Sequence, residues 1–238
     1  MGDYRFYLDR VLTKKKLQDN YALRFDGVDD YCEVPDSLSA YSFIQNTLVF
    51  TIKTRVRFIN LNDRNLFFGN NLGTANQKGI FGGLENFGEF GIKALRINIT
   101  NGVNNRNIDA KTQDNVINDN EYHEIIYRCP EPGNNIEILV DGVSLSVIYL
   151  RPFDFLSNGD SSDNLNMGLV RANASARNVE IDYIKIWNQY KTDDSDTGLV
   201  SHWKFNEGTG CIAADSVGGY DANLMPDCPT NSPEWIKL

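Results

Sequence analysis

The stretch YALRFDGVDDYCEVPDS, residues 21–37, decides the fold. Two short runs, ALRF and YCEV, lie on either side of a turn that contains Gly27 and the aspartates Asp26, Asp29 and Asp30. Gly and Asp are typical of turns, because Gly adopts positive φ and the Asp side chain accepts hydrogen bonds from nearby backbone. The stretch therefore predicts extended chain interrupted by an acidic turn.

Apolar residues alternate with polar ones in other parts of the chain. In TLVFTIKTRVRF, residues 47–58, the apolar side chains from Phe50 to Phe58 share one face and Lys53, Arg55 and Arg57 share the other. This period of two predicts a strand with one buried face. The runs IEILV and VSLSVIYL flank Asp141-Gly142, a dipeptide typical of a type I′ hairpin turn.

About a dozen such runs, and no apolar stripe with helical spacing, predict an all-β chain of two packed antiparallel sheets. At 238 residues the chain is expected to form one domain. The predicted division is an N-terminal arm at residues 1–20, either a short helix or an extended arm, followed by a sandwich at residues 21–238. Polar loops are predicted at residues 99–119 and 154–164.

Three motifs carry a family resemblance. Residues 22–31 read A-L-x-F-D-G-x-D-D-Y, residues 181–188 read I-D-x-x-x-I-W-N, and residues 203–210 read W-x-F-x-E-G-x-G, followed by Asp215 and the pair Gly218-Gly219. Together they resemble the laminin-G-like domains of the concanavalin-A-like lectin and glucanase superfamily, in particular a phage virion-associated type. The resemblance implies an antiparallel two-sheet jelly-roll sandwich.

The order of the motifs departs from the family pattern, because the third motif normally precedes the first. Residues 199–238 are either a permuted segment that closes the sandwich or the stub of a second repeat. A stub of this size buries too little apolar surface to be stable alone, which favours closure. Five apolar side chains are then expected to pack on the main body: Leu199, Trp203, Phe205, Ile212 and Trp235.

Composition excludes several classes of partner. The formal net charge is -9 and the only basic cluster is at residues 14–16, so nucleic acid is not expected as a partner. No run is long and apolar enough for a spanning helix, and residues 1–10 do not read as a signal peptide. We expect no membrane insertion, and synthesis without a leader unless Met1 was introduced at a new start.

The cysteines and histidines do not have the spacing of a zinc site. Buried thiols are the default expectation for Cys32, Cys129, Cys211 and Cys228, and a bond between Cys211 and Cys228 is the alternative in an oxidising compartment.

Catalysis is not expected. Glycosidases of this fold family commonly place paired carboxylates on one strand as Glu-x-Asp-x-x-Glu, and here Lys185 stands in place of the second glutamate after Glu180 and Asp182. We interpret Glu180 and Asp182 as polar groups at a strand end that bind a loop.

Calcium is the candidate cofactor that the sequence supports best, since it binds six to eight oxygens that two loops can supply together. Asp26, Asp29 and Asp30 are candidate ligands in the first turn, and the resemblance places Asp215 nearby. The alternative is an Asx-turn, in which Asp26 and Asp29 only accept backbone hydrogen bonds beside Gly27.

No sugar-binding residue can be assigned from the sequence. Trp187 and Trp203 are expected in the core or between the sheets, and only Trp235 is a candidate for exposure.

The predicted function is that of a non-catalytic structural or adhesion protein on a virion surface. The expected partners are other virion proteins or copies of the chain itself, with host glycans as candidate ligands. The alternative is a secreted or cell-surface carbohydrate-binding module, and a glycoside hydrolase is the third class.

Overall fold

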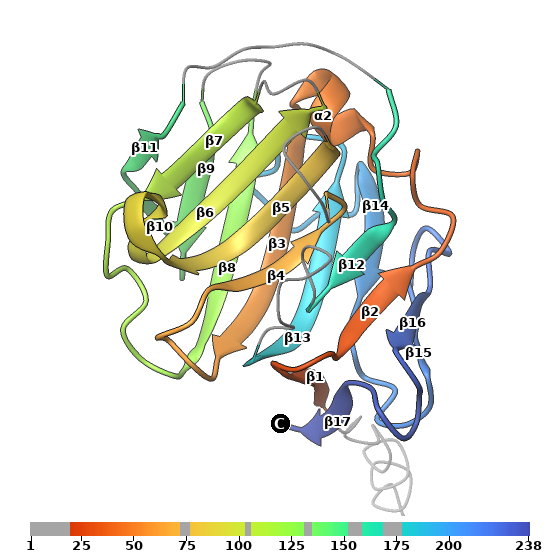
Figure 1. Ribbon diagram of the computed structural model, residues 1–238. Coiled ribbons are helices and arrows are strands. Elements are labelled where there is room, and N and C mark those ends of the chain that lie inside the picture. The colour runs from red at the N-terminus through yellow and green to blue at the C-terminus, as the bar shows by residue number, and fades with distance from the viewer. Residues whose placement is uncertain (1–19, 72–76, 103–105, 131–134, 152–158, 169–177) are drawn as a thin grey trace, which may run out of the picture.

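The computed structural model describes residues 20–71, 77–102, 106–130, 135–151, 159–168 and 178–238 (Figure 1). The predicted arm at residues 1–20 lies outside this part of the chain, except for its last residue. Among the described residues, no helix is long and apolar enough to cross a membrane.

The described residues form two antiparallel sheets, as predicted (Figure 1). The eight-stranded sheet runs in the order β10-β9-β8-β3-β13-β1-β17, with β14 also paired to β13. Its strands are β1 (Tyr21–Asp26), β3 (Phe50–Phe58), β8 (Tyr122–Cys129), β9 (Glu137–Val140), β10 (Val143–Leu145), β13 (Asn178–Trp187), β14 (Leu199–Trp203) and β17 (Glu234–Lys237).

The nine-stranded sheet runs in the order β11-β7-β6-β5-β4-β12-β2-β16-β15. Its strands are β2 (Tyr31–Val34), β4 (Asn65–Gly69), β5 (Lys78–Asn86), β6 (Ile92–Asn101), β7 (Arg106–Thr112), β11 (Val147–Tyr149), β12 (Leu165–Met167), β15 (Ile212–Ala213) and β16 (Ala222–Met225). Two short helical turns, α2 (Phe43–Thr47) and η1 (Gly88–Phe90), complete the described secondary structure.

The two faces of β3 confirm the alternation read from the sequence. Phe50, Ile52, Val56 and Phe58 are fully buried between the sheets, where apolar burial contributes roughly 25 cal/mol per Å². Lys53, Arg55 and Arg57 alternate with them on the outer face of the eight-stranded sheet and are partly exposed. This face therefore carries a row of cations on one strand.

The hairpin at Asp141-Gly142 is also confirmed. Val140 pairs with Val143, and the two turn residues have φ values of 50° and 78°, as a type I′ turn requires. The second run does not continue as one strand, however. It divides into β10 on one sheet and β11 on the other, so it turns the corner between the sheets.

The prediction of a polar loop at residues 99–119 is wrong in part, because this segment holds the end of β6 and all of β7. Ile108, Ala110 and Thr112 alternate along β7 and are buried. The many polar residues between them obscured this period of two in the sequence.

Residues 199–238 close the sandwich, as predicted. β14 pairs with β13, β17 pairs with β1, and β16 pairs with β2, so the segment adds strands to both sheets. Trp203 and Phe205 are fully buried, but Ile212 is 52% exposed on the edge strand β15. Its predicted packing on the main body is therefore wrong. That this arrangement is a permutation of the family order stays a prediction.

The cysteines of this closing segment are paired. Cys211 and Cys228 form a disulfide that spans 17 residues, so the alternative pairing holds and the default of buried thiols is wrong for them. Cys32 and Cys129 are buried, as expected.

A buried ion cluster lies on the outer side of the nine-stranded sheet. Nη1 of Arg96 donates to Oε1 of Glu85 over 2.9 Å, and Nε of Arg96 donates to Oδ1 of Asp109 over 2.8 Å. The guanidinium also lies 4.0 Å from the ring centroid of Phe90. The three charged side chains come from β6, β5 and β7, so the cluster connects neighbouring strands.

Candidate functional site

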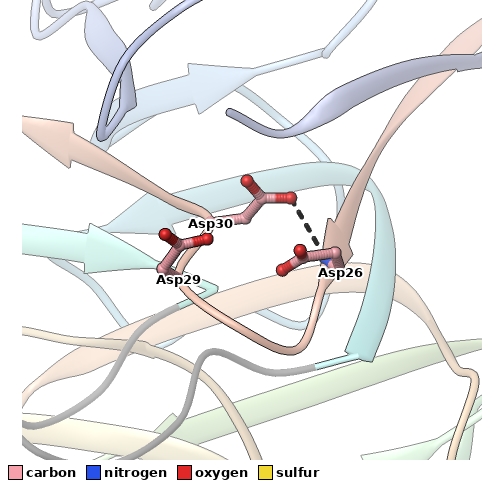
Figure 2. A group of neighbouring side chains, drawn as sticks. All are labelled: Asp26, Asp29 and Asp30. Atoms are coloured by element: carbon pink, nitrogen blue, oxygen red, sulfur yellow. Dashed lines mark hydrogen bonds between the residues drawn. The ribbon is translucent and has the colours of Figure 1, made fainter. Parts of the chain in front are cut away.

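The acidic turn lies between β1 and β2, and Figure 2 shows its three carboxylates. Asp26, Asp29 and Asp30 each offer a carboxylate oxygen within 4.8 Å of the others. The backbone N–H of Val28 donates to Oδ1 of Asp26 over 2.7 Å, which confirms the Asx-turn at Asp26. Asp29 instead accepts a hydrogen bond from Nδ2 of Asn231 over 2.8 Å, so no Asx-turn at Asp29 is found in the described part of the chain.

Asp30 is the buried member of the three, at 5% exposure. Its Oδ2 accepts the backbone N–H of Asp26 over 3.1 Å (Figure 2). Burial raises the pKa of Asp30 to about 6; the hydrogen bond from Asp26 opposes this rise, and the charges of Asp26 and Asp29 add to it. These convergent carboxylate oxygens fit a hard cation such as calcium.

The structure does not bring Asp215 into this group. Its Oδ1 accepts the backbone N–H groups of His202 and Val217, and its Oδ2 accepts those of Gly218 and Tyr220. Both oxygens therefore hold the loop before β16 in place. The calcium role of the aspartates remains a prediction.

Glu180 and Asp182 do not bind a loop, and that interpretation is wrong. Glu180 is fully buried within β13, and its Oε1 accepts two hydrogen bonds from Arg24, at 2.8 and 2.5 Å. Its Oε2 accepts one from the hydroxyl of Tyr122 over 2.9 Å and one from Arg57 over 3.3 Å. Oδ2 of Asp182 accepts a hydrogen bond from Nη1 of Arg55 over 2.7 Å. Both carboxylates are thus ion-paired.

Strand register explains how these residues meet. Arg24 on β1 lies opposite Glu180 on β13, Glu180 lies opposite Arg57 on β3, and Arg57 lies opposite Tyr122 on β8. Because directly opposed residues share a face of a sheet, the four side chains form one row across the outer face.

This row lines a cavity of about 410 Å³, which we call the arginine cavity. Its lining residues are Arg24, Arg55, Arg57, Tyr122, Glu180, Ile236, Lys237 and Leu238. The side chains of the three arginines are 45%, 39% and 38% exposed, respectively. The guanidinium carbon of Arg55 lies 4.5 Å from the ring centroid of Tyr122. The cavity therefore combines accessible hydrogen-bond donors with an aromatic and aliphatic wall.

A second cavity of about 350 Å³ lies on the same outer face, around Lys53, Arg128 and Lys191. Each of these cations has a carboxylate partner within 3.0 Å: Asp194 for Lys53, Glu137 for Arg128 and Asp193 for Lys191. The arginine cavity is the better candidate for a ligand site, because its three guanidinium side chains are 38–45% exposed, whereas the three cations of the second cavity are only 10–15% exposed.

The chain resembles known proteins in its fold. No family model matches the sequence, and no curated protein matches it. Among solved structures, a Bacteroides ovatus protein, named as a suspected carbohydrate-binding protein, aligns with a TM-score of 0.59 and 16% identity. The alignment covers 93% of this chain and 61% of that one, so this chain spans less than two thirds of its length.

A second similar structure is the CBM40 domain of the Ruminococcus gnavus IT-sialidase, bound to alpha2,3 sialyllactose. It aligns with a TM-score of 0.54 and 12% identity over 73% of this chain and 92% of that one. The fold is a lectin-like jelly-roll sandwich. A weaker match, with a TM-score of 0.49 and 14% identity, is to the LG4-5 domains of the mouse laminin alpha1 chain, over 76% of this chain and 45% of that one.

The tryptophans of the jelly roll differ in their burial. Trp203 lies in the core, as predicted. Trp187 is also buried, but its position opposite Thr51 places it on the outer face, where Nε1 donates to the carbonyl of Ser195. Trp235 is partly exposed, and its Nε1 donates to the carbonyl of Gly210. None of the three lines the arginine cavity.

Sequence reasoning missed the arginine cavity of the jelly roll. One signal was present, because alternation along β3 places Arg55 and Arg57 on the outer face. The partners Arg24 and Glu180 are 156 residues apart, and no local pattern shows that their strands are adjacent.

Proposed function

We propose that this chain is a non-catalytic carbohydrate-binding module and that the arginine cavity is its ligand site. The observation that carries the proposal is the lining itself, in which three partly exposed guanidinium groups stand beside the ring of Tyr122 and the side chain of Ile236. Ligand sites commonly combine an apolar wall with a few placed polar groups in a cavity of this size. Sugars suit such a lining, because they present hydroxyl groups and apolar ring faces together.

Similar proteins support this proposal. The Bacteroides ovatus protein is named for carbohydrate binding, and the Ruminococcus gnavus CBM40 domain was solved with sialyllactose bound. At 16% and 12% identity these likenesses concern the fold. The choice of site therefore rests on the cavity of this chain.

The state of the two carboxylates on β13 supports a role without catalysis. Glu180 is fully buried and its two oxygens accept four hydrogen bonds, while Asp182 is paired with Arg55. A glycosidase needs one carboxyl group that can give up a proton and a second that faces the sugar. Lys185 occupies the position where that second acid would stand.

Removal of an arginine side chain from the cavity should weaken glycan binding at least tenfold. Arg55→Ala is the preferred variant, because it leaves the fully buried Glu180 with all its partners, and its own partner Asp182 has a side chain that is 11% exposed and can be hydrated. Arg151→Ala, at an exposed arginine outside the cavity, is the matched control. A glycan array selects the ligand and calorimetry then compares the three proteins. Equal affinities for the wild type and Arg55→Ala would place the site elsewhere.

Incubation of the protein with glycans tests the absence of catalysis. Glycans recognised on the array should yield no reducing ends above the level of a heat-denatured sample. Turnover that disappears in Glu180→Gln would show that the chain is a glycosidase.

The place of the module on a virion surface, with other virion proteins or copies of the chain as partners, remains a proposal from the sequence. A secreted or cell-surface module is the alternative. Detection of this chain by mass spectrometry of purified virions would support the virion surface, and its absence from them would support the alternative.

We also propose that the acidic turn binds calcium. An ion that binds only the folded state stabilises it by RT ln(1 + [L]/Kd), about 2.7 kcal/mol at a hundredfold excess over Kd. Calcium should therefore raise the melting temperature of chelator-treated protein, and magnesium should do so poorly because it requires near-octahedral geometry.

The variant Asp30→Asn distinguishes calcium binding from an Asx-turn that binds no ion. The raised pKa of Asp30, about 6, means that its charged form is unfavourable in the folded state. Without calcium, Asp30 should add to the stability of the wild type as the pH falls from above 6 towards 3.8, because its carboxyl group binds a proton in the folded state before it does in the unfolded state. The lowered pKa of His202, about 4, acts in the opposite sense over the same range, so the contribution of Asp30 is measured as the difference between the wild type and Asp30→Asn.

In chelator at pH 8, Asp30→Asn should accordingly melt at a higher temperature than the wild type and gain nothing from calcium. Asp36→Asn, at an exposed aspartate outside the turn, should keep the wild-type response. Identical melting curves of the wild type in calcium and in chelator would leave the Asx-turn at Asp26 as the whole explanation.

A further inference from the structure

Four guanidinium nitrogens in the arginine cavity have no hydrogen-bond partner within the part of the chain that the structure describes. They are Nη1 of Arg24, Nη2 of Arg57, and Nε and Nη2 of Arg55. Arg24 and Arg57 direct their other N–H groups to Glu180 and the carbonyl of Asn120, and Arg55 directs one to Asp182. Donors therefore remain on each of the three arginines.

Glu180 cannot satisfy these donors. A carboxylate accepts about four hydrogen bonds, and Glu180 already accepts two from Arg24, one from Arg57 and one from Tyr122. It lies buried beneath the arginines and fixes two guanidinium groups in place. A ligand would therefore meet these two donor groups already oriented, which lowers the entropic cost of binding.

We infer that the ligand of the arginine cavity is an acidic sugar whose carboxylate binds the unpaired guanidinium N–H groups. Arginine presents N–H donors in a planar fork that matches a carboxylate in a bidentate manner, and such charge-assisted bonds are about twice as strong as neutral ones. The side chain of Ile236 then lies beside the carbon skeleton of the sugar, and the ring of Tyr122 supports the guanidinium group of Arg55. This inference rests on the proposed function and specifies its ligand class.

A matched pair of glycans tests the inference. Calorimetry on the full chain compares 3′-sialyllactose with lactose, and trigalacturonate with galactotriose. The acidic member of at least one pair should bind at least tenfold more tightly than its neutral counterpart. Its affinity should fall when the salt concentration is raised from 50 to 200 mM, while that of the neutral sugar should not change.

Arg55→Gln should reduce this preference to less than threefold, because glutamine keeps a donor and loses the charge. Arg151→Gln, outside the cavity, should leave the preference unchanged, and both variants should melt within a few degrees of the wild type. Acetate alone should shift the NMR signals of the Arg55 side chain, which shows whether the cavity accepts a carboxylate without a sugar.

The outcomes separate this inference from the proposed function. Neutral and acidic sugars bound equally, with both weakened in Arg55→Gln, would overturn the acidic class and leave carbohydrate binding in the cavity. Acetate shifts without binding of any glycan would overturn the proposed function and leave a carboxylate site. A charge preference that persists in Arg55→Gln would place the acidic ligand at another surface.

Discussion

Trp203→Ala is expected to lower the free energy of unfolding by about 3–5 kcal/mol, the usual range for a large aromatic removed from a core. Trp203 is fully buried on β14, and its ring centroid lies 6.3 Å from that of Tyr41. Its Nε1 donates to the carbonyl of Tyr220 over 2.8 Å, so the substitution also leaves a polar group without a partner. Trp203 therefore packs the closing segment, residues 199–238, against the core.

Urea denaturation followed by circular dichroism measures this change. Ile212→Ala, in the same segment but 52% exposed, is the control and should change the free energy of unfolding by less than 1 kcal/mol. A chain truncated to residues 1–198 should be insoluble, since β1, β2 and β13 would each lose a neighbouring strand. A soluble truncation that melts cooperatively would show that residues 199–238 do not complete the fold.

Arg96→Met should destabilise the chain by about 3–5 kcal/mol, because it removes a buried cation that pairs with two buried carboxylates. The side chains of Glu85 and Asp109 are fully buried, and that of Arg96 is only 2% exposed. Glu85 keeps a hydrogen bond from Arg64, but Arg96 is the residue that links it to Asp109. The cost arises from the lost cation rather than from lost volume, since methionine retains most of the aliphatic packing.

Lys111→Met is the matched control, because Lys111 pairs with the exposed Asp114 on the same sheet and such surface pairs contribute about 0–1 kcal/mol. Adding Glu85→Gln to Arg96→Met should recover part of the stability by removing the charge of one of the two buried carboxylates that Arg96 pairs with. If Arg96→Met and Lys111→Met cost the same in thermal and urea unfolding, the cluster contributes no more than a surface pair.

The parts of the fold that were predicted correctly depend on short stretches of sequence. The two faces of β3 follow from alternation over nine residues, and the turn at Asp141-Gly142 follows from two residues that tolerate positive φ. Both features could be predicted because residues close together in the sequence determine them. The acidic turn was predicted for the same reason, and the hydrogen bond from Val28 to Asp26 spans only two residues.

The parts that were missed depend on which strands become neighbours. Glu180 was expected to bind a loop, yet it binds Arg24, 156 residues away, because β1 lies beside β13. The run at residues 143–150 looked like one strand, and the exchange between sheets at its midpoint follows from pairing with β7. Pairing between strands that lie so far apart in the sequence produces no periodic pattern in it.

The position of β1 has a consequence for how the chain acquires its structure. β1 is made early, but its two neighbours are β13 and β17, which come near the end of the chain. At 5–20 residues per second, on the order of 10 s separates the synthesis of β1 from that of its first partner. During this interval the backbone N–H and C=O groups of β1 have no strand to pair with, and its apolar side chains have no completed core. The fold therefore cannot be completed until β17 has been made, and contacts of high sequence separation, rather than local turns, set the rate of that step.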